Sequence, residues 1–378
     1  MKVTIYFGHH KVGSTALQSF LFRNQLELMD HGLLYPGVES ESLAYTLSRL
    51  HSARDPGLDR QRQLGAARKG PAPMNAREPH NALAFQMLAQ ATEGKVPPWH
   101  AGLPSVGQMI RTIRLQAQFL RPEALVLCSE VMANFGLRHP DLINRIAGIV
   151  PQGAHQLYCV LRRPDEYLVS WHAQRLRFGD KVLSLSGGAA RRYVSTLHFN
   201  YTSFLDPWVK HFDGAPVHVR NYADVLAAGG SVEDFFEETQ LTLPPGLETA
   251  RRANESMPSA AMEIARRGNE DLPREEADKL RHYLLTCRDH LKPVANKDVE
   301  MFGASLRAEL REAFEPVHSY LSAHVGRPFF PDLEDMTRVR PIPEAEAVAD
   351  LLRQIPHKRL PSDAVRAFIT TMTREHAA

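Results

Sequence analysis

The chain has 378 residues, of which 43% are hydrophobic and 23% are charged, proportions that are typical of globular proteins and exclude a disordered chain, a coiled coil or a collagen-like fibre. Lys and Arg total 45 against 43 Asp and Glu, giving a formal net charge of +2. A global basic field for nucleic acid is therefore not expected, and any anion site must be local.

Residues 2–8 are largely β-branched and aromatic and predict the first strand of the fold. This apolar run is too short for the hydrophobic region of a signal peptide, and no run of about 18 apolar residues predicts a transmembrane segment. The three cysteines, Cys128, Cys159 and Cys287, are odd in number and widely spaced. Their pattern does not predict a disulfide framework or a zinc site, and it fits a cytoplasmic location.

The next elements are a turn and then a helix over about residues 15–30, which has apolar positions on one face and Gly32 at its C-terminal end. Residues from about 39 to 120 have a different character, with many prolines, polar Arg-rich runs and one clear helix candidate over 81–92. We interpret this stretch as a helical insertion in a core fold. Both a lid or acceptor-binding wall and a surface loop without function remain open for it.

Nearly continuous apolar runs over residues 124–130, 155–162 and 216–222 predict strands that are buried on both faces, as in a parallel sheet covered by helices. From about residue 259 onward the periodicity is helical, with breaks at four prolines: Pro273, Pro293, Pro328 and Pro341. The expected fold is α/β. It is a three-layer sandwich with a mostly parallel central sheet in residues 1–260, including the insertion, and a helical C-terminal region, 261–378, packed on that core.

The turn between the first strand and the first helix, Gly8-His9-His10-Lys11-Val12-Gly13-Ser14-Thr15, has the features of an anion site. Its backbone N–H groups and the helix N-terminus favour an anion, Lys11 adds a full charge, and Ser14 and Thr15 add hydroxyl donors. The pattern G-x-x-x-x-G-K-[ST] is nearly met, which favours a P-loop NTPase-like fold, but the lysine precedes the second glycine by two residues. The alternative is a plain turn with a solvated lysine and Ser14 as the helix N-cap.

A second motif follows the strand candidate 155–162. Arg162 ends that strand, Pro164 suits the first position of a helix, and Ser170 follows almost two turns later. Ligands of open α/β sheets bind at the carboxyl edge, where this arginine lies, and its fork of donors suits a phosphate. A charged helix entry without a ligand remains the alternative.

Together the two motifs resemble the sulfotransferases that use 3′-phosphoadenosine 5′-phosphosulfate (PAPS). The family's loop for the 5′-phosphosulfate has the form Lys-x-Gly-[Ser/Thr]-[Ser/Thr], which residues 11–15 match: Lys11, Val12, Gly13, Ser14 and Thr15. Its 3′-phosphate site is an Arg, a Pro two residues later and a Ser eight residues after the Arg, which Arg162, Pro164 and Ser170 match.

A third segment is similar to the Asn-x-Ser segment that bacterial relatives carry near the nucleotide, and it contains Arg252, Asn254 and Ser256. These residues could equally start a surface helix. One departure from the family is His10, which stands where many eukaryotic members have a proline before the lysine.

Glu130 lies at the end of the strand candidate 124–130 and is the expected general base. A carboxylate at the carboxyl edge of a parallel sheet can accept a proton from an acceptor hydroxyl, and several carbohydrate and tyrosyl-protein sulfotransferases use a glutamate in this way. We expect this strand to neighbour the first strand, which would bring Glu130 over the Lys11 loop. His9 and His10 are rival bases, although two adjacent residues cannot both face the site, and a structural role for Glu130 also remains open.

The resemblance implies an enzyme that transfers a sulfuryl group from PAPS to a hydroxyl or amine of a glycan, a lipid or a small molecule, without a metal or nucleic acid. It implies that Lys11 neutralises charge on the oxygen that bridges sulfur and phosphorus. Two other interpretations remain: a Mg-ATP-dependent, kinase-like P-loop enzyme, and a non-catalytic nucleotide-binding scaffold for a protein partner.

Overall fold

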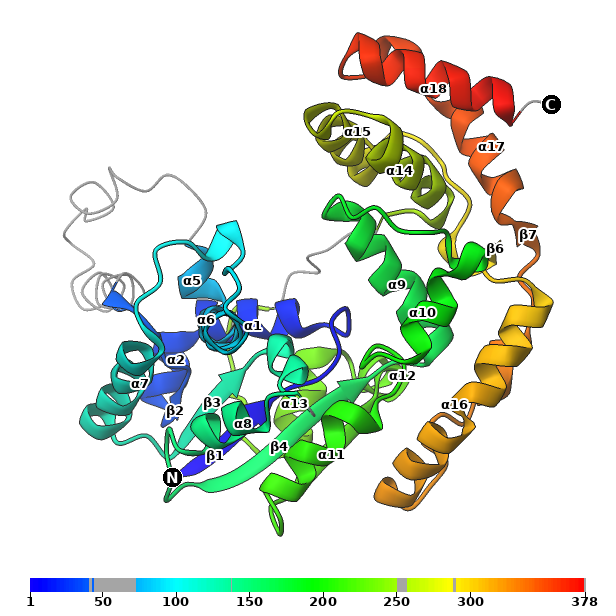
Figure 1. The fold of residues 1–378 in the computed structure, drawn as a ribbon. Coiled ribbons are helices and arrows are strands. Elements are labelled where there is room, and N and C mark those ends of the chain that lie inside the picture. Colours follow the sequence, from blue (N-terminus) through cyan, green and yellow to red (C-terminus); the bar gives the residue numbers. More distant parts are fainter. Residues whose placement is uncertain (41–42, 44–72, 137, 250–256, 288–289, 377–378) are drawn as a thin grey trace. The chain divides into compact units, whose positions relative to one another are not determined.

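The computed structural model describes residues 1–40, 43, 73–136, 138–249, 257–287 and 290–376. The chain forms two compact units (Figure 1): the described parts of 1–162 and 202–253, and the described parts of 163–201 and 254–378. This division differs from the expected boundary near residue 260, because residues 163–201 group with the C-terminal helices.

The first unit is built on a five-stranded parallel sheet with the strand order β2-β3-β1-β4-β5. Its strands are β1 (Lys2–Tyr6), β2 (Leu33–Leu34), β3 (Ala124–Cys128), β4 (Ala154–Leu161) and β5 (Val217–Asn221). The α/β class and the parallel sheet are confirmed. So is the expected neighbour of the first strand, since β1 pairs with β3 so that Tyr6 lies opposite Cys128. The strands β1 and β3 each end two residues before the predicted limit.

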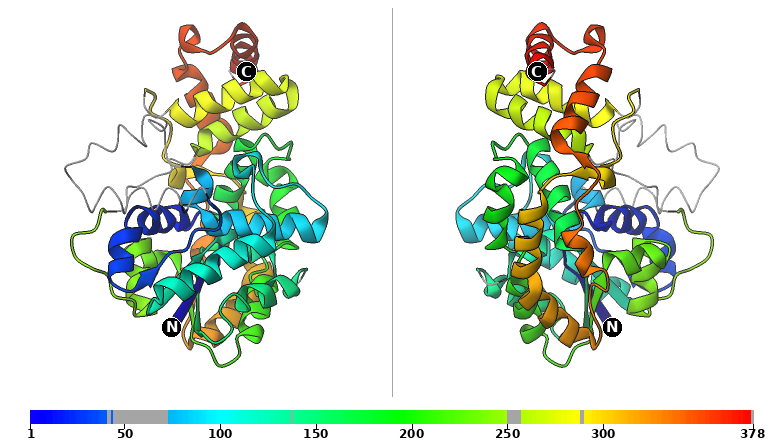
Figure 2. Two further views of the ribbon diagram at one scale, coloured as in Figure 1. Left: turned by 90° about the vertical axis from the view of Figure 1, so that its left-hand side faces the viewer. Right: turned by 90° about the vertical axis from the view of Figure 1, so that its right-hand side faces the viewer.

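Helices cover both faces of this sheet (Figure 1, Figure 2), an arrangement that is compatible with the expected three-layer sandwich. On one face Tyr6 and Tyr158 belong to a buried cluster with residues of α1 and α13. On the other face the Phe7 ring stacks on Trp208 of α11. The helices of this unit are α1 (Ser14–Arg23), α2 (Gln25–Asp30), α5 (Met74–Arg77), α6 (Pro79–Thr92), α7 (Val106–Leu120), α8 (Pro140–Ala147), α11 (Thr202–His211), α12 (Tyr222–Ala227) and α13 (Ser231–Thr239), with short 3₁₀ turns η1 (Pro98–His100) and η2 (Glu130–Asn134).

The single helix predicted over 15–30 is in fact two helices, α1 and α2, which are separated at Asn24. The side-chain amide of Asn24 donates hydrogen bonds to the Phe20 carbonyl, at 3.0 Å, and to the Glu248 carbonyl, also at 3.0 Å. Asn side chains compete for backbone groups in this way and thereby interrupt helices. Gly32 has φ +77°, as expected for the residue that ends this helical segment.

The second unit is mostly helical, as predicted for the C-terminal region. Its elements are α9 (Pro164–Arg177), the π-helical turn η3 (Leu185–Ala189), α10 (Ala190–Val194), α14 (Ser259–Asp271), α15 (Arg274–Thr286), η5 (Asn296–Asp298), β6 (Val299–Glu300), α16 (Ala304–Val325), η6 (Leu333–Thr337), β7 (Ile342–Pro343), α17 (Glu344–Gln354), η7 (His357–Arg359) and α18 (Asp363–Glu375). Pro273 is the N-cap of α15, so this proline does mark a helix boundary.

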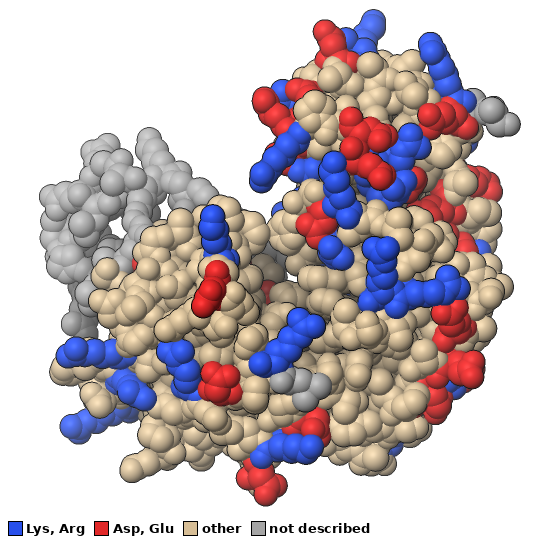
Figure 3. Space-filling view, viewed as in Figure 1, with Lys and Arg blue, Asp and Glu red and all other residues tan. Residues whose placement is uncertain are grey.

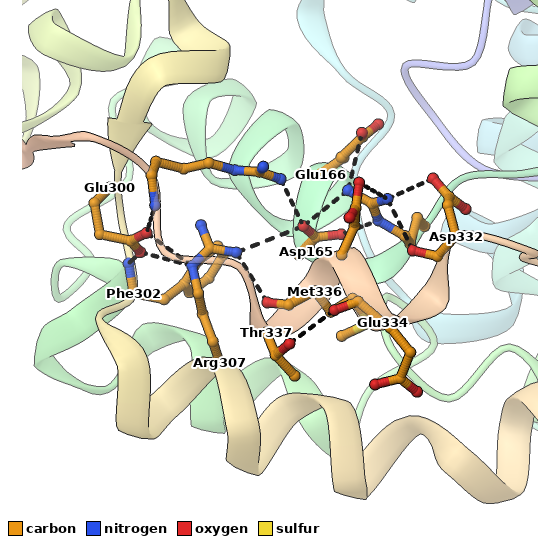
Figure 4. A network of polar contacts seen from close by, with 12 residues as sticks. Asp165, Glu166, Glu300, Phe302, Arg307, Asp332, Glu334, Met336 and Thr337 are labelled. Atoms are coloured by element: carbon orange, nitrogen blue, oxygen red, sulfur yellow. Dashed lines mark hydrogen bonds and ion pairs between the residues drawn. The ribbon is translucent and has the colours of Figure 1, made fainter.

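A network of charged side chains holds the start of α9 within the second unit (Figure 4). Asp165 accepts a hydrogen bond from Arg163 at 2.8 Å and has Arg307 and Arg340 at 3.6 Å. Arg163 also pairs with Asp332, and both Arg163 and Asp165 are buried. Buried charges need several such partners. The second arginine of the Arg-Arg-Pro motif is therefore a structural residue at the helix entry.

On the face shown in Figure 3, Lys and Arg side chains alternate with Asp and Glu in both units, in line with the small net charge. Cys128, Cys159 and Cys287 are buried thiols. In the described part of the chain, none of the helices combines the length and the apolar character needed to cross a membrane.

Candidate functional site

The loop between β1 and α1 has a backbone that few residues other than glycine adopt easily. Lys11 has φ +64° and Gly13 has φ +89°, and left-handed residues of this kind occur in the backbone nests that bind anions. Gly8 is required by a close approach, because a Cβ there would lie 3.0 Å from the backbone N and O of Val160. Strand β4 thus fixes where the loop leaves the sheet.

The helix α1 begins at Ser14, and Gly13 is its N-cap. The alternative in which Ser14 caps the helix is therefore wrong: Ser14 is the first helical residue, it is buried, and its hydroxyl hydrogen-bonds the Glu130 carboxylate. The first turn of α1 carries no acidic residue. The helix N-terminus and the Lys11 charge therefore both favour an anion at this end of the loop.

Glu130 lies directly beyond β3, over the loop, as expected from the pairing of β3 with β1. Its Oε2 accepts a hydrogen bond from Nε2 of Gln18 at 3.3 Å, and its Oε1 accepts one from Nδ2 of Asn81 at 3.3 Å. Nδ1 of His10 lies 3.8 Å from Oε1. The Glu130 side chain is 12% exposed, so the carboxylate is held by donors on several sides.

Burial raises the pKa of Glu130. This effect is outweighed by the hydrogen bond and charge of His10 and by hydrogen bonds from the Glu130 backbone N–H and the Ser14 hydroxyl. The pKa of Glu130 therefore lies below its ordinary value. Hydrogen bonds to a carboxylate favour the ionised form in this way. The neighbouring Glu78 behaves oppositely, because burial and the charge of Glu130 raise its pKa. Glu130 is therefore the more acidic member of this pair.

The two histidines of the loop point in different directions, as the sequence led us to expect. His10 faces Glu130. His9 is 1% exposed, its ring lies beside Phe204 at 5.4 Å, and its Nδ1 accepts a hydrogen bond from the backbone N–H of Arg162 at 3.4 Å. His9 thus ties the loop to the end of β4, and His10 is the histidine of the candidate site.

The predicted phosphate-binding residues fall into four groups. Lys11, Val12, Gly13, Ser14 and Thr15 lie together in the loop and the start of α1. Arg162 follows β4 in the first unit, with its guanidinium carbon 5.4 Å from the centre of the Tyr222 ring. Ser170 lies in α9 of the second unit, whereas Arg252, Asn254 and Ser256 fall outside the described residues.

Sequence reasoning missed Gln18, Glu78, His80 and Asn81, which surround Glu130 or the end of β3. A signal for two of them exists, because His80 and Asn81 open a helix whose next residues, Ala82, Leu83 and Ala84, are all buried. Two polar residues on an otherwise buried surface need partners. Among the residues that the structure describes, no cluster of His, Cys, Asp or Glu is arranged to hold a metal ion.

Replacement of Gly13 by alanine is expected to lower the stability by about 1–3 kcal/mol, the cost of a strained backbone conformation. The added Cβ would also overlap the Ser231 side chain at the start of α13. Gly102→Ala is the matched control, because Gly102 has φ +74° but a Cβ there meets nothing within 4 Å. Thermal unfolding of both variants tests this, and equal losses would show that contact with Ser231 does not matter.

Comparison of the chain with protein-family models, with curated proteins and with solved structures gave no match.

Proposed function

We propose that this chain is a sulfotransferase, which moves a sulfuryl group from PAPS to a hydroxyl or amine of an acceptor. The observation that carries the proposal is the meeting of an anion-favouring loop with a carboxylate–histidine pair at one edge of a parallel sheet. Lys11 and the N-terminus of α1 provide positive potential, and Glu130 with His10 lies beside them. In-line displacement needs this combination of charge neutralisation and a nearby proton acceptor.

The chain's own residues divide into two tasks. Lys11, Gly13, Ser14 and Thr15 would bind the 5′-phosphosulfate, with Lys11 nearest the bond that breaks, because charge grows there in the transition state. The pair of Glu130 and His10 would take the proton of the acceptor. The strand order supports a P-loop NTPase-like core for this site. The Lys11 loop follows β1, which is the central strand and lies between β3 and β4.

Nucleotide binding in the presence of a chelator tests the proposal. We expect adenosine 3′,5′-bisphosphate to bind in EDTA, measured by calorimetry, and to bind more tightly than ATP with Mg²⁺. Incubation with PAPS and a panel of glycans, lipids and small phenols or amines should then give a sulfated product by mass spectrometry. Preference for Mg-ATP would favour the kinase-like alternative, and binding without turnover on any acceptor would favour the scaffold.

Arg162→Ala is expected to lower the affinity for adenosine 3′,5′-bisphosphate by about 10- to 150-fold. This factor corresponds to the loss of a charged hydrogen bond of roughly 1.5–3 kcal/mol. Adenosine 5′-monophosphate should bind nearly as before, because it lacks the 3′-phosphate. Arg163→Ala is the contrasting variant: Arg163 is buried among Asp165, Glu166 and Asp332, so its loss should lower the Tm. If Arg162→Ala lowers the affinity for both nucleotides equally, Arg162 has a structural role and does not bind the 3′-phosphate.

A further inference from the structure

The insertion helix α6 reaches the candidate site through two buried polar side chains, His80 and Asn81, which are 0% and 2% exposed. Among the described residues, strand β2 pairs with the first two residues of β3, Ala124 and Leu125. At the other end of β3, Nδ1 of His80 accepts a hydrogen bond from the backbone N–H of Cys128 at 3.1 Å. Because Nδ1 is the acceptor, the proton of this neutral ring lies on Nε2, and burial lowers the pKa of His80 to about 3.

Asn81 uses the full hydrogen-bonding capacity of its amide. Its Oδ1 accepts from the Ser129 hydroxyl at 2.6 Å and from Nε2 of Gln18 at 3.2 Å. Its Nδ2 donates to Glu78 at 3.0 Å and to Glu130 at 3.3 Å. A flipped amide would point its N–H groups at Nε2 of Gln18, which is itself a donor to the Cys128 carbonyl, so the partners fix the orientation.

We propose that Asn81 is a positioning residue, which fixes the carboxylate of Glu130 in place against His10. The inference rests on the proposed function of that carboxylate. It makes the insertion a part of the site and excludes an ornamental role for α6. Gln18 of α1 also helps to position Glu130, since its side-chain amide donates hydrogen bonds to both Asn81 and Glu130.

Titratable groups from several described elements interact with Glu130. His10 of the loop lowers the pKa of Glu130, and Glu130 in turn acts on Glu78 before α6, on His100 of η1 and on the neutral side chains of Tyr6, Tyr35 and Cys128. Of these, Glu78 is the carboxylate that shares the Asn81 donor with Glu130. The shared donor therefore separates two like charges.

Asn81→Asp is the sharpest test, because it keeps the shape and the oxygen that accepts from Ser129 and Gln18 but replaces the donor by a third carboxylate. The Glu130 carboxyl should titrate about one pH unit higher, or more, since both a donor and a charge have changed. The measurement is ¹³C NMR of glutamate-labelled protein, with Glu130→Gln for assignment. Asn24→Asp is the matched control: Asn24 is also 2% exposed and its partners are Phe20 and Glu248. An unmoved Glu130 titration in Asn81→Asp overturns the inference.

A second measurement uses turnover. Asn81→Ala should lower kcat by about tenfold in the wild-type background and have no further effect in the Glu130→Gln background, because residues that act through one another are not additive. The same factor in both backgrounds would mean a merely structural role. If the protein neither binds the bisphosphate nor turns over PAPS, the proposed function fails, but the NMR titration still decides the role of Asn81.

Discussion

Lys11→Ala is expected to lower kcat by about 100-fold or more while leaving the fold intact, following the scale for the loss of one electrostatic stabiliser in an active site. In the proposed reaction Lys11 would contact the part of the donor where negative charge grows as the sulfuryl group leaves. Its half-buried side chain extends from a turn that lies outside the sheet and α1, so the core packing should not change. Turnover of PAPS at the wild-type rate would show that the loop does not bind the phosphosulfate.

Two further variants separate the charge of Lys11 from its backbone. Lys11 has φ +64°, a conformation in which glycine carries no steric cost. Lys11→Gly should therefore keep the wild-type Tm and still lose turnover, while Lys11→Arg should retain part of the activity, because it keeps the charge but changes the geometry. A Lys11→Gly protein that unfolds at a lower temperature would point to packing by the side chain.

The sheet could be predicted from the sequence because a buried parallel strand has a simple signature. The apolar runs at 124–128 and 154–161 leave few alternatives, and both flank β1 in the structure. The break at Asn24 could not be predicted, since Glu248, one of its partners, is distant in the sequence. The grouping of residues 163–201 with the C-terminal helices could not be predicted either. Their periodicity predicts helices, but it does not show which elements these helices pack on.

For the site, the sequence predicted which elements meet but not which side chains satisfy one another. The placement of Glu130 over the loop follows from strand order alone. Its hydrogen-bond donors Gln18 and Asn81 lie 112 and 49 positions away in the sequence. No local sequence pattern predicts contacts over such separations. The adjacent arginines give the same lesson. Arg163 turns into the network around Asp165, whereas Arg162 stays at the end of β4 beside Tyr222, and only the structure distinguishes them.

Glu130→Gln is expected to lower kcat by about 10²- to 10⁴-fold, the contribution of a general base, with little change in affinity for adenosine 3′,5′-bisphosphate. Glutamine keeps the shape and the hydrogen bonds to Gln18 and Asn81 in part, but it cannot accept a proton. His10→Asn is the companion variant, because His10 lies 3.8 Å from Glu130. His9→Asn serves as the control on the same loop, since His9 faces Phe204.

The pH dependence of kcat/KM distinguishes the two bases. The pKa of Glu130 lies below its ordinary value of 4.5, so this carboxylate is ionised above that pH and loses its basicity only as the pH falls through the lowered pKa. A Glu130 base therefore predicts a flat profile from about pH 5 upward, whereas a histidine base gives an acid limb near pH 6.5, the ordinary histidine value. The donors around Glu130 weaken it as a base but suit it to orient His10. If Glu130→Gln stays active while His10→Asn is inactive, and the wild-type profile shows the acid limb of a histidine base, the proton goes to His10 and Glu130 is the carboxylate that holds it.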